Sequence, residues 1–200
     1  MQRLETADAL AIRQQKEWTE ILTSFETANR YAVIGPDGEE VYFAAETGGS
    51  FFGRQFLKQA RPFTIEVMDA AGQSILQVRR PWRWYFYEVA VHDSEGNLLG
   101  RVQKRFSWLR RVYAVYDAAG RELYELFGPI LHPWTFQIRS NGAEMGKITK
   151  NWSGLMKEAF TAADNFGVTF PADAGVQHKA ILLGAVFLID FAHFEKRNDD

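Results

Sequence analysis

The sequence predicts a mainly β protein: a closed antiparallel barrel around a buried C-terminal α-helix, with a short helix near the N-terminus. Three observations support this. Short alternating segments are separated by turn motifs at regular intervals, no helical stretch interrupts them, and an apolar segment lies near the C-terminus. We expect the 200 residues to form one domain, 1–200, with its folded core at about 22–195.

Five turn motifs divide the central part of the chain. They combine Asp, Asn or Pro with a following Gly, which suits type I turns whose last residue has a positive φ. The motifs are residues 36–38, 69–72, 93–96, 117–120 and 140–142. Hairpins in series predict antiparallel β structure, and closing the sheet removes its exposed edges. Calcium ligation is the alternative role for these Asp-Gly turns, but hairpin geometry explains them without it.

Two segments have helical character. Residues 8–24 carry Ile12, Trp18, Ile21 and Leu22 at roughly helical spacing, which predicts the N-terminal helix. The segment 179–194 is apolar on nearly every side, so it predicts a helix buried either in a core or in a membrane. It would rise only about 24 Å against roughly 30 Å of hydrocarbon, and Asp190 interrupts it. We therefore expect the central helix of the barrel, with a transmembrane anchor as the alternative.

Composition excludes several classes of function. A net charge of −2 gives no nucleic-acid signature, and the absence of cysteine excludes disulfides, Cys-based zinc sites and palmitoylation. The N-terminal residues lack an apolar core, so no signal peptide is predicted. The sequence also lacks Walker, G-x-G-x-x-G and G-x-S-x-G motifs, and its four histidines have no metal-ligand spacing. We expect a protein that is not an enzyme and has no catalytic residues.

An ordered series of motifs resembles the phospholipid scramblase family. The segments that carry the resemblance are residues 22–31, 41–46, 61–63, 80–81, 128–129, 146–154, 163–171, 187–191 and 194–195. The resemblance implies a tubby-like fold, which is a twelve-stranded barrel around a central C-terminal helix. It also implies calcium-stimulated movement of phospholipids between leaflets. The cysteine clusters of animal members are missing here, and their Asp-Ala-Asp triplet reads Ala-Ala-Asp at 162–164.

The calcium candidates follow from that resemblance. They are Asp164, Asn165 and Asp173, supported by Thr161 and Thr169. Calcium takes six to eight oxygen ligands, ideally including several carboxylates, so this set is thin. The alternative is a polar turn that leads into the final helix.

Two basic and aromatic stretches predict a membrane-binding surface. Trp settles at the headgroup level of a bilayer, and Lys and Arg are attracted to anionic lipids. The candidate residues are Arg79, Arg80, Trp82, Arg83, Trp84, Lys104, Arg105, Trp108, Arg110 and Arg111. Residues 49–57 would add a third, apolar loop. The alternative is that alternate residues are strand core and the arginines are simply solvated.

The sequence therefore favours a protein on the cytoplasmic face of the plasma membrane, peripherally bound to acidic phospholipids, with possible calcium-influenced, bidirectional lipid movement. One alternative is a soluble tubby-like module that binds a phosphoinositide or a protein without scrambling. Another is a structural or regulatory partner protein with no lipid function. A closed barrel filled by its own helix would offer no hydrophilic path, so we expect weak scrambling by this domain alone.

Overall fold

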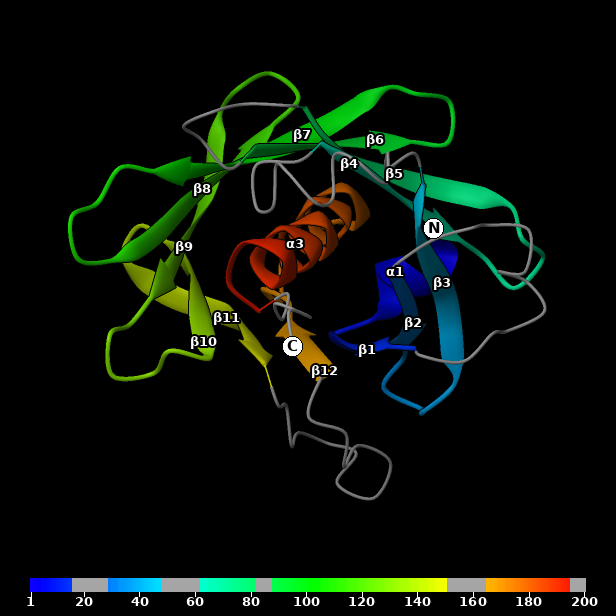
Figure 1. Ribbon diagram of the computed structural model, residues 1–200, viewed down its shortest axis with the longest axis horizontal. Helices are drawn as coiled ribbons and strands as arrows, with labels where there is room; N and C mark the ends of the chain where they lie inside the picture. Colours follow the sequence, from blue (N-terminus) through cyan, green and yellow to red (C-terminus); the bar gives the residue numbers. More distant parts are fainter. Residues whose placement is uncertain (16–28, 48–61, 82–87, 151–164, 195–200) are drawn as a thin grey trace, which may run out of the picture.

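The structure is a computed structural model of the chain, and it describes residues 1–15, 29–47, 62–81, 88–150 and 165–194. Within these ranges, twelve antiparallel strands form a closed barrel around the helix α3 (Val176–Ile189). Figure 1 shows α3 in the centre of the ring of strands. The predicted fold class is confirmed.

The strands follow one another around the barrel in sequence order, and the first pairs with the last. They are β1 (Ala9–Gln14), β2 (Arg30–Ile34), β3 (Glu40–Thr47), β4 (Phe63–Met68), β5 (Ser74–Arg80), β6 (Glu88–Asp93), β7 (Leu98–Arg105), β8 (Arg111–Asp117), β9 (Glu122–Gly128), β10 (Thr135–Ser140), β11 (Ala143–Lys150) and β12 (Asn165–Thr169). A short helix α1 (Gln2–Thr6) precedes them, and a π-helix η3 (Asp190–Phe194) continues α3.

The N-terminal helix is present, but its predicted bounds of about 8–24 were wrong in the part that the structure describes. The helix is α1, whereas Ala9–Gln14 form β1. The first four residues of β1 are all buried, and Leu10 and Ile12 join the core. Pairing with β2 and β12 therefore outweighs a local helical pattern. Residues 16–28 lie outside the described residues.

The five predicted turns are confirmed as the tight connections of five hairpins. In the turn that follows β4, Asp69 Oδ1 accepts hydrogen bonds from the backbone N–H groups of Ala71 and Gln73, each at 2.9 Å. Gly72 then has a φ of +75°, a conformation that favours glycine. Four of the hairpins have a register shift at the turn, as expected for a type I turn followed by a bulge. The β10–β11 hairpin differs, because Asn141 and Gly142 both have a positive φ, which is the conformation of a two-residue type I′ turn.

The helix α3 is the core of the barrel. Its residues from Lys179 to Ile189 are all buried, which explains why no polar face is visible in the sequence. In the described part of the chain, Val176–His193 has the length and composition of a membrane span, but 78% of it is buried inside the barrel. The prediction of a buried central helix at about 179–194 is confirmed.

Close packing between α3 and the wall requires a small residue at one position. A Cβ atom added to Gly184 would lie 2.5 Å from Val91 Cγ2 and 3.5 Å from Val78 Cγ2. Both valines belong to the inner face of the barrel and are fully buried. Gly184 is therefore a contact point between the helix and strands β5 and β6.

We expect Gly184→Val to lower the free energy of unfolding by about 1–3 kcal/mol, because stiff β-branched neighbours cannot move aside. Urea unfolding followed by circular dichroism measures this. Gly175→Ser is the matched control, since a Cβ at Gly175, the N-cap residue immediately before α3, has nothing within 4 Å. Equal stability of the Gly184→Val protein and the control would contradict the proposed packing.

Candidate functional site

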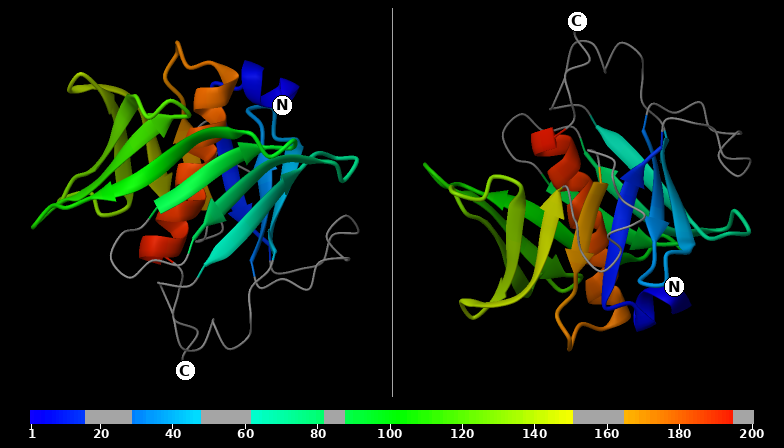
Figure 2. Two further views of the ribbon diagram at one scale, coloured as in Figure 1. Left: turned by 90° about the horizontal axis from the view of Figure 1, so that it is seen from above. Right: turned by 90° about the horizontal axis from the view of Figure 1, so that it is seen from below.

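The barrel has two chemically different ends. One end carries the five tight turns, α1 and the start of α3; we call it the turn end. The other carries the described loops 106–110 and 129–134 and the end of α3 with η3; we call it the loop end. Figure 2 shows α1 beside the start of α3 at one end, with the red end of α3 at the other. Lys179 Nζ donates to the Glu5 carbonyl at 2.7 Å, which joins α3 to α1 at the turn end.

Carboxylates dominate the turn end. The acidic residues of its segments are Glu5, Asp8, Asp37, Glu39, Glu40, Asp69, Asp93, Glu95, Asp117, Glu122, Glu144 and Asp173. The same segments contain the cations Arg3, Arg121 and Arg139 and the buried Lys179, and Arg13 and Arg105 form ion pairs with Glu40 and Glu122 of this end. Arg121 donates to Asp117 at 2.8 Å, and Arg3 lies 3.7 Å from Asp37, so both guanidinium groups are offset locally. This end of the barrel therefore has a negative potential.

Cations dominate the described part of the loop end. They are Arg30, Arg79, Arg80, Lys104, Arg105, Arg110, Arg111 and Lys150, of which Arg105 is paired with Glu122, whereas the carboxylates there are Glu46, Glu88 and Asp190. Glu46 and Asp190 are buried and accept hydrogen bonds from Asn29 and Tyr31, and Arg30, Arg80 and Lys150 are buried as well, so these five groups add little to the surface potential. Among the described residues, the exposed charges are thus mainly acidic at the turn end and mainly basic at the loop end.

Exposed apolar side chains are concentrated at the loop end. The described residues include seven exposed large hydrophobic side chains, and six of these lie in the neighbouring loops 106–110 and 129–134. We call these six the apolar tip: Phe106, Trp108, Leu109, Ile130, Leu131 and Trp134. Trp108 and Leu131 are each 88% exposed, which is unusual for side chains that globular proteins normally cover.

Arg111 joins the two loops of the apolar tip. It is the first residue of β8, and it pairs with Gly128 at the end of β9. Its guanidinium donates to the carbonyl oxygens of Pro129, His132 and Pro133, and lies 4.7 Å from the centre of the Phe136 ring. Burial lowers the pKa of this guanidinium from its ordinary value. Arg111 is therefore a structural residue that holds the 129–134 loop against the barrel mouth.

The mouth of the barrel at the loop end is closed by η3. Tyr31 Oη donates to Asp190 Oδ2 at 2.8 Å, and Tyr113 Oη lies 2.7 Å from His193 Nε2. Burial, reinforced by the positive charges of Arg111 and Lys104, lowers the pKa of His193 to about 4. His193 is consequently neutral near pH 7, and two tyrosines from opposite walls hold the end of the helix.

The predicted lipid-binding residues fall into different environments. Arg79 and Arg110 are exposed, and the Arg110 guanidinium lies 5.5 Å from the Phe127 ring centre. Arg80 is buried at 5% exposure beside Phe63, so it faces the interior instead of a membrane.

The second stretch divides in the same way. Lys104 is half-buried, Trp108 is exposed, and Arg111 is structural. Arg105 forms an ion pair with Glu122 and lies 3.7 Å from Glu125, along the outer wall. The remaining candidates, Trp82, Arg83, Trp84 and the loop at 49–57, lie outside the described residues.

Of the six residues of the apolar tip, the sequence-based candidates included only Trp108, and the whole 129–134 loop was missed. Ile130, Leu131 and Trp134 lie in a segment that contains Pro129 and Pro133. Proline cannot donate to a strand ladder, so apolar residues beside two prolines are poor candidates for a sheet core. That signal would have identified the 129–134 loop as an exposed apolar connection.

The calcium candidates do not lie together. Asn165 is buried at the loop-end start of β12, whereas Asp173 is exposed in the connection at the turn end. The four residue steps of β12 alone separate them by about 13 Å. Asp164 lies outside the described residues. Among the described residues, no group of three or more His, Cys, Asp or Glu is arranged to hold a metal ion, and one Asn oxygen is too little for calcium.

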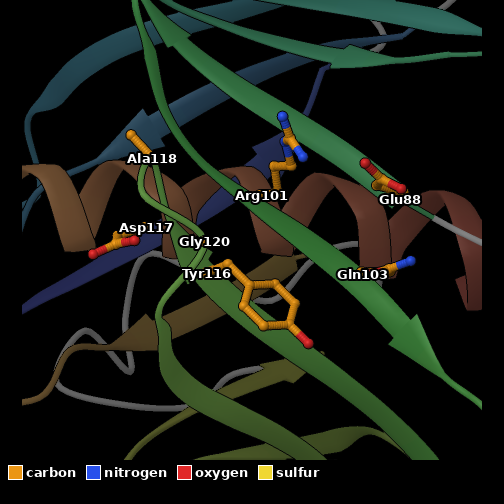
Figure 3. Close-up of a pocket in the computed structure, with 7 residues that line it drawn as sticks. All are labelled: Glu88, Arg101, Gln103, Tyr116, Asp117, Ala118 and Gly120. Atoms are coloured by element: carbon orange, nitrogen blue, oxygen red, sulfur yellow. The ribbon is translucent and has the colours of Figure 1, made fainter.

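Grooves on the outer wall do not suit a polyphosphate. The groove in Figure 3 has a volume of about 380 Å³ and lies over β6, β7 and β8. Arg101 is the one cation among its lining residues, against Glu88 and Asp117. A second groove places Arg139 against Glu122 and Glu125. A phosphoinositide headgroup requires an excess of positive charge, which neither groove offers.

The fold and the loop end together define a class of protein. It is a twelve-stranded barrel that is filled by a helix and has one basic end, which carries the apolar tip. A family model described as Scramblase matches residues 1–196. The chain therefore belongs to the phospholipid scramblase family, and its barrel is the tubby-like fold expected for that family.

Individual relatives agree with this assignment. The chain is 34% identical to human phospholipid scramblase 1 over 98% of its own length, and spans 65% of that protein. It is 32% identical to human phospholipid scramblase 2, with 98% of this chain and 70% of the relative covered. A crystal structure of an Arabidopsis thaliana protein has the same fold at 10% identity, with a TM-score of 0.51 and coverage of 94% of this chain and 96% of the other.

We expect His193→Gln to remove part of the acid sensitivity of the fold. The pKa of His193 is about 4 in the folded protein and 6.5 ordinarily. The unfolded chain therefore binds a proton as pH falls through 6.5, and the folded protein does not until pH reaches about 4. In this window the group should cost the wild type up to about 3 kcal/mol of unfolding free energy.

Urea unfolding across that pH window measures the effect of His193. His132→Gln is the matched control, because His132 is exposed in the 129–134 loop. Parallel stability curves for the wild type and both variants would contradict the role assigned to His193.

We expect any calcium response of this protein to depend on Asp164 and not on Asp173. Asp173 lies at the turn end, too far from Asn165 to share an ion with it. Vesicle binding of Asp164→Asn and Asp173→Asn, each with and without millimolar calcium, provides the comparison. Loss of a calcium response in Asp173→Asn alone would contradict this expectation.

Proposed function

We propose that this protein binds acidic phospholipids peripherally through its loop end and, as a scramblase-family protein, promotes lipid movement between leaflets. The observation that carries the proposal is the separation of charge between the two ends of the barrel. Anionic headgroups attract the cationic loop end and repel the acidic turn end, so the potential also orients the molecule. We place it at the cytoplasmic face of the plasma membrane, where anionic lipids are abundant.

Exposed cations supply most of the attraction in this proposal. Arg79 and Arg110 are exposed on the outer wall, and the half-buried Lys104 lies near the end of β7. Cations near an anionic surface contribute about 1 kcal/mol each. Arg80 and Arg111 are excluded from this role because they are held by interior rings and by carbonyl groups.

We propose that lipids move along the outside of the barrel and not through its interior. The interior is filled by α3, whose residues from Ile181 to Ile189 are at most 1% exposed apart from Gly184, which is also buried. A polar headgroup would need a hydrophilic route, and packed apolar side chains do not supply one. We therefore infer that the protein acts by perturbing the lipid layer at its loop end.

The mixed charge of the outer grooves argues against the alternative of a phosphoinositide-binding module. The groove that contains Arg101 also contains two carboxylates. A groove of this composition favours a polar peptide over a multiply charged phosphate.

The triple variant Lys104→Gln, Arg110→Gln and Arg79→Gln tests the proposed function. We expect binding to anionic vesicles to weaken by at least about tenfold, because three headgroup attractions are removed. Flotation with neutral and anionic vesicles at low and high salt measures it. Arg121→Gln, a loss of positive charge at the turn end, should bind like the wild type; equal weakening by both variants would contradict an oriented surface.

A further inference from the structure

We propose that the apolar tip inserts as a preformed wedge into the headgroup region of a phospholipid layer. This inference rests on the proposed function and adds the contact that follows electrostatic attraction. The occupant is the lipid layer itself, at the boundary between headgroups and acyl chains. The insertion is carried by Phe106, Trp108 and Leu109 from one loop and by Ile130, Leu131 and Trp134 from the other.

Exposure is the first argument. These six side chains are between 51% and 88% exposed, whereas the seventh exposed large hydrophobic of the described residues, Met145, is 39% exposed on β11. Apolar surface of this kind is costly in water and is stabilised when it is covered. Trp and Leu together suit the boundary of a bilayer, where the indole N–H meets headgroups and the aliphatic chain meets hydrocarbon.

Preorganisation is the second argument. The 129–134 loop is closed by the hydrogen bonds from His132 N to Pro129 O and from Thr135 N to His132 O, at 3.3 and 3.1 Å. Lys150 N donates to Trp134 O at 2.8 Å, which ties the loop to β11. Together with the hydrogen bonds from Arg111 to three carbonyl groups, these contacts hold the loop in its exposed conformation. Side chains that are already ordered lose less entropy on insertion.

The second loop is shorter and is also held in place. Arg110 N donates to Ser107 Oγ at 3.3 Å, and the Arg110 guanidinium packs on Phe127. Arg139 lies on the same ring, 3.9 Å from its centre. The guanidinium of Arg110 thus borders the apolar tip, whereas Arg139 extends to the Phe127 ring from the turn-end part of β10. In an anionic lipid layer, the phosphate groups lie outside the hydrocarbon. A protein whose apolar side chains extend beyond its cations can therefore place the apolar groups in the hydrocarbon and the cations beside the phosphates.

This arrangement favours a lipid layer over a protein partner or a second copy of the chain. The apolar side chains come from two loop tips at one end of a barrel, and fluid lipid can surround them from every side. The two grooves described above lie on the wall over strands, and they are polar. A second copy would also bring two cationic ends together, which electrostatic repulsion opposes.

The chain is well suited to a direct test because it contains no cysteine. Single variants Leu109→Cys and Leu131→Cys can each carry an environment-sensitive nitrobenzoxadiazole label, with Ala119→Cys in the turn after β8 as the matched control. We expect blue-shifted emission at 109 and 131 with anionic vesicles, and quenching by nitroxides on the acyl chains. The label at 119 should show neither.

Binding strength gives a second readout. We expect the double variant Leu109→Ser, Leu131→Ser to bind vesicles about tenfold or more weakly at high salt, where electrostatic attraction is screened. The control Ala119→Ser should bind like the wild type. Because both leucines are exposed, these substitutions leave the barrel core intact.

The outcomes separate the two proposals. Wild-type binding to anionic vesicles, with no spectral change at either label and no weakening in the double variant, would overturn the wedge and leave the electrostatic proposal standing. Failure of the wild type to bind any vesicle would overturn both. Concentration-dependent dimerisation that buries both labels without lipid would assign the apolar tip to a second copy and would also overturn the wedge.

Discussion

The barrel depends on one constraint: an apolar helix without a polar face has to be covered on every side. A single sheet or a pair of helices would leave part of α3 in water, whereas a closed ring of strands covers it completely. The ring also removes the free edges of the sheet. Close approach at Gly184 and the stacked rings of Phe63 and Phe191, 4.2 Å apart, show how tightly helix and wall fit.

Because α3 fills the interior of the barrel, binding has to use its outer surface and its two ends. The residue types that form the tight turns make those two ends chemically different. Type I turns favour Asp at their first position because its carboxylate accepts the backbone N–H groups of the turn. Asp69, Asp93 and Asp117 all do so. The residues that make the hairpins tight therefore also make one end acidic. The opposite end, free of that requirement, carries the exposed Arg79 and Arg110 and the apolar tip.

The loop end is coupled to the core through a small group of side chains. Arg111 lies on Phe136, which contributes to the interior, and its guanidinium holds the carbonyls of the 129–134 loop. His193 lies near the same ring, with 5.5 Å between their centres, and reaches Tyr113. The conformation of the surface loop therefore depends on the packing at the mouth. In a scramblase-family protein, this links the stability of the central helix to the surface that we propose meets lipid.

The sequence by itself determined the local features: the five turns, the apolar central helix and, through their combination, the closed antiparallel barrel. Turn residues and helix apolarity are encoded within short segments, so local chemistry is enough to predict them. The structure alone decided that Ala9–Gln14 are a strand, that Arg80 and Arg111 are held at the mouth, and that Asn165 and Asp173 lie at opposite ends. Strand register decides which side chains face inward, and the path of the chain decides which loops are neighbours. Both result from pairing between residues far apart in sequence, as in the contact between β1 and β12, and no local pattern records them.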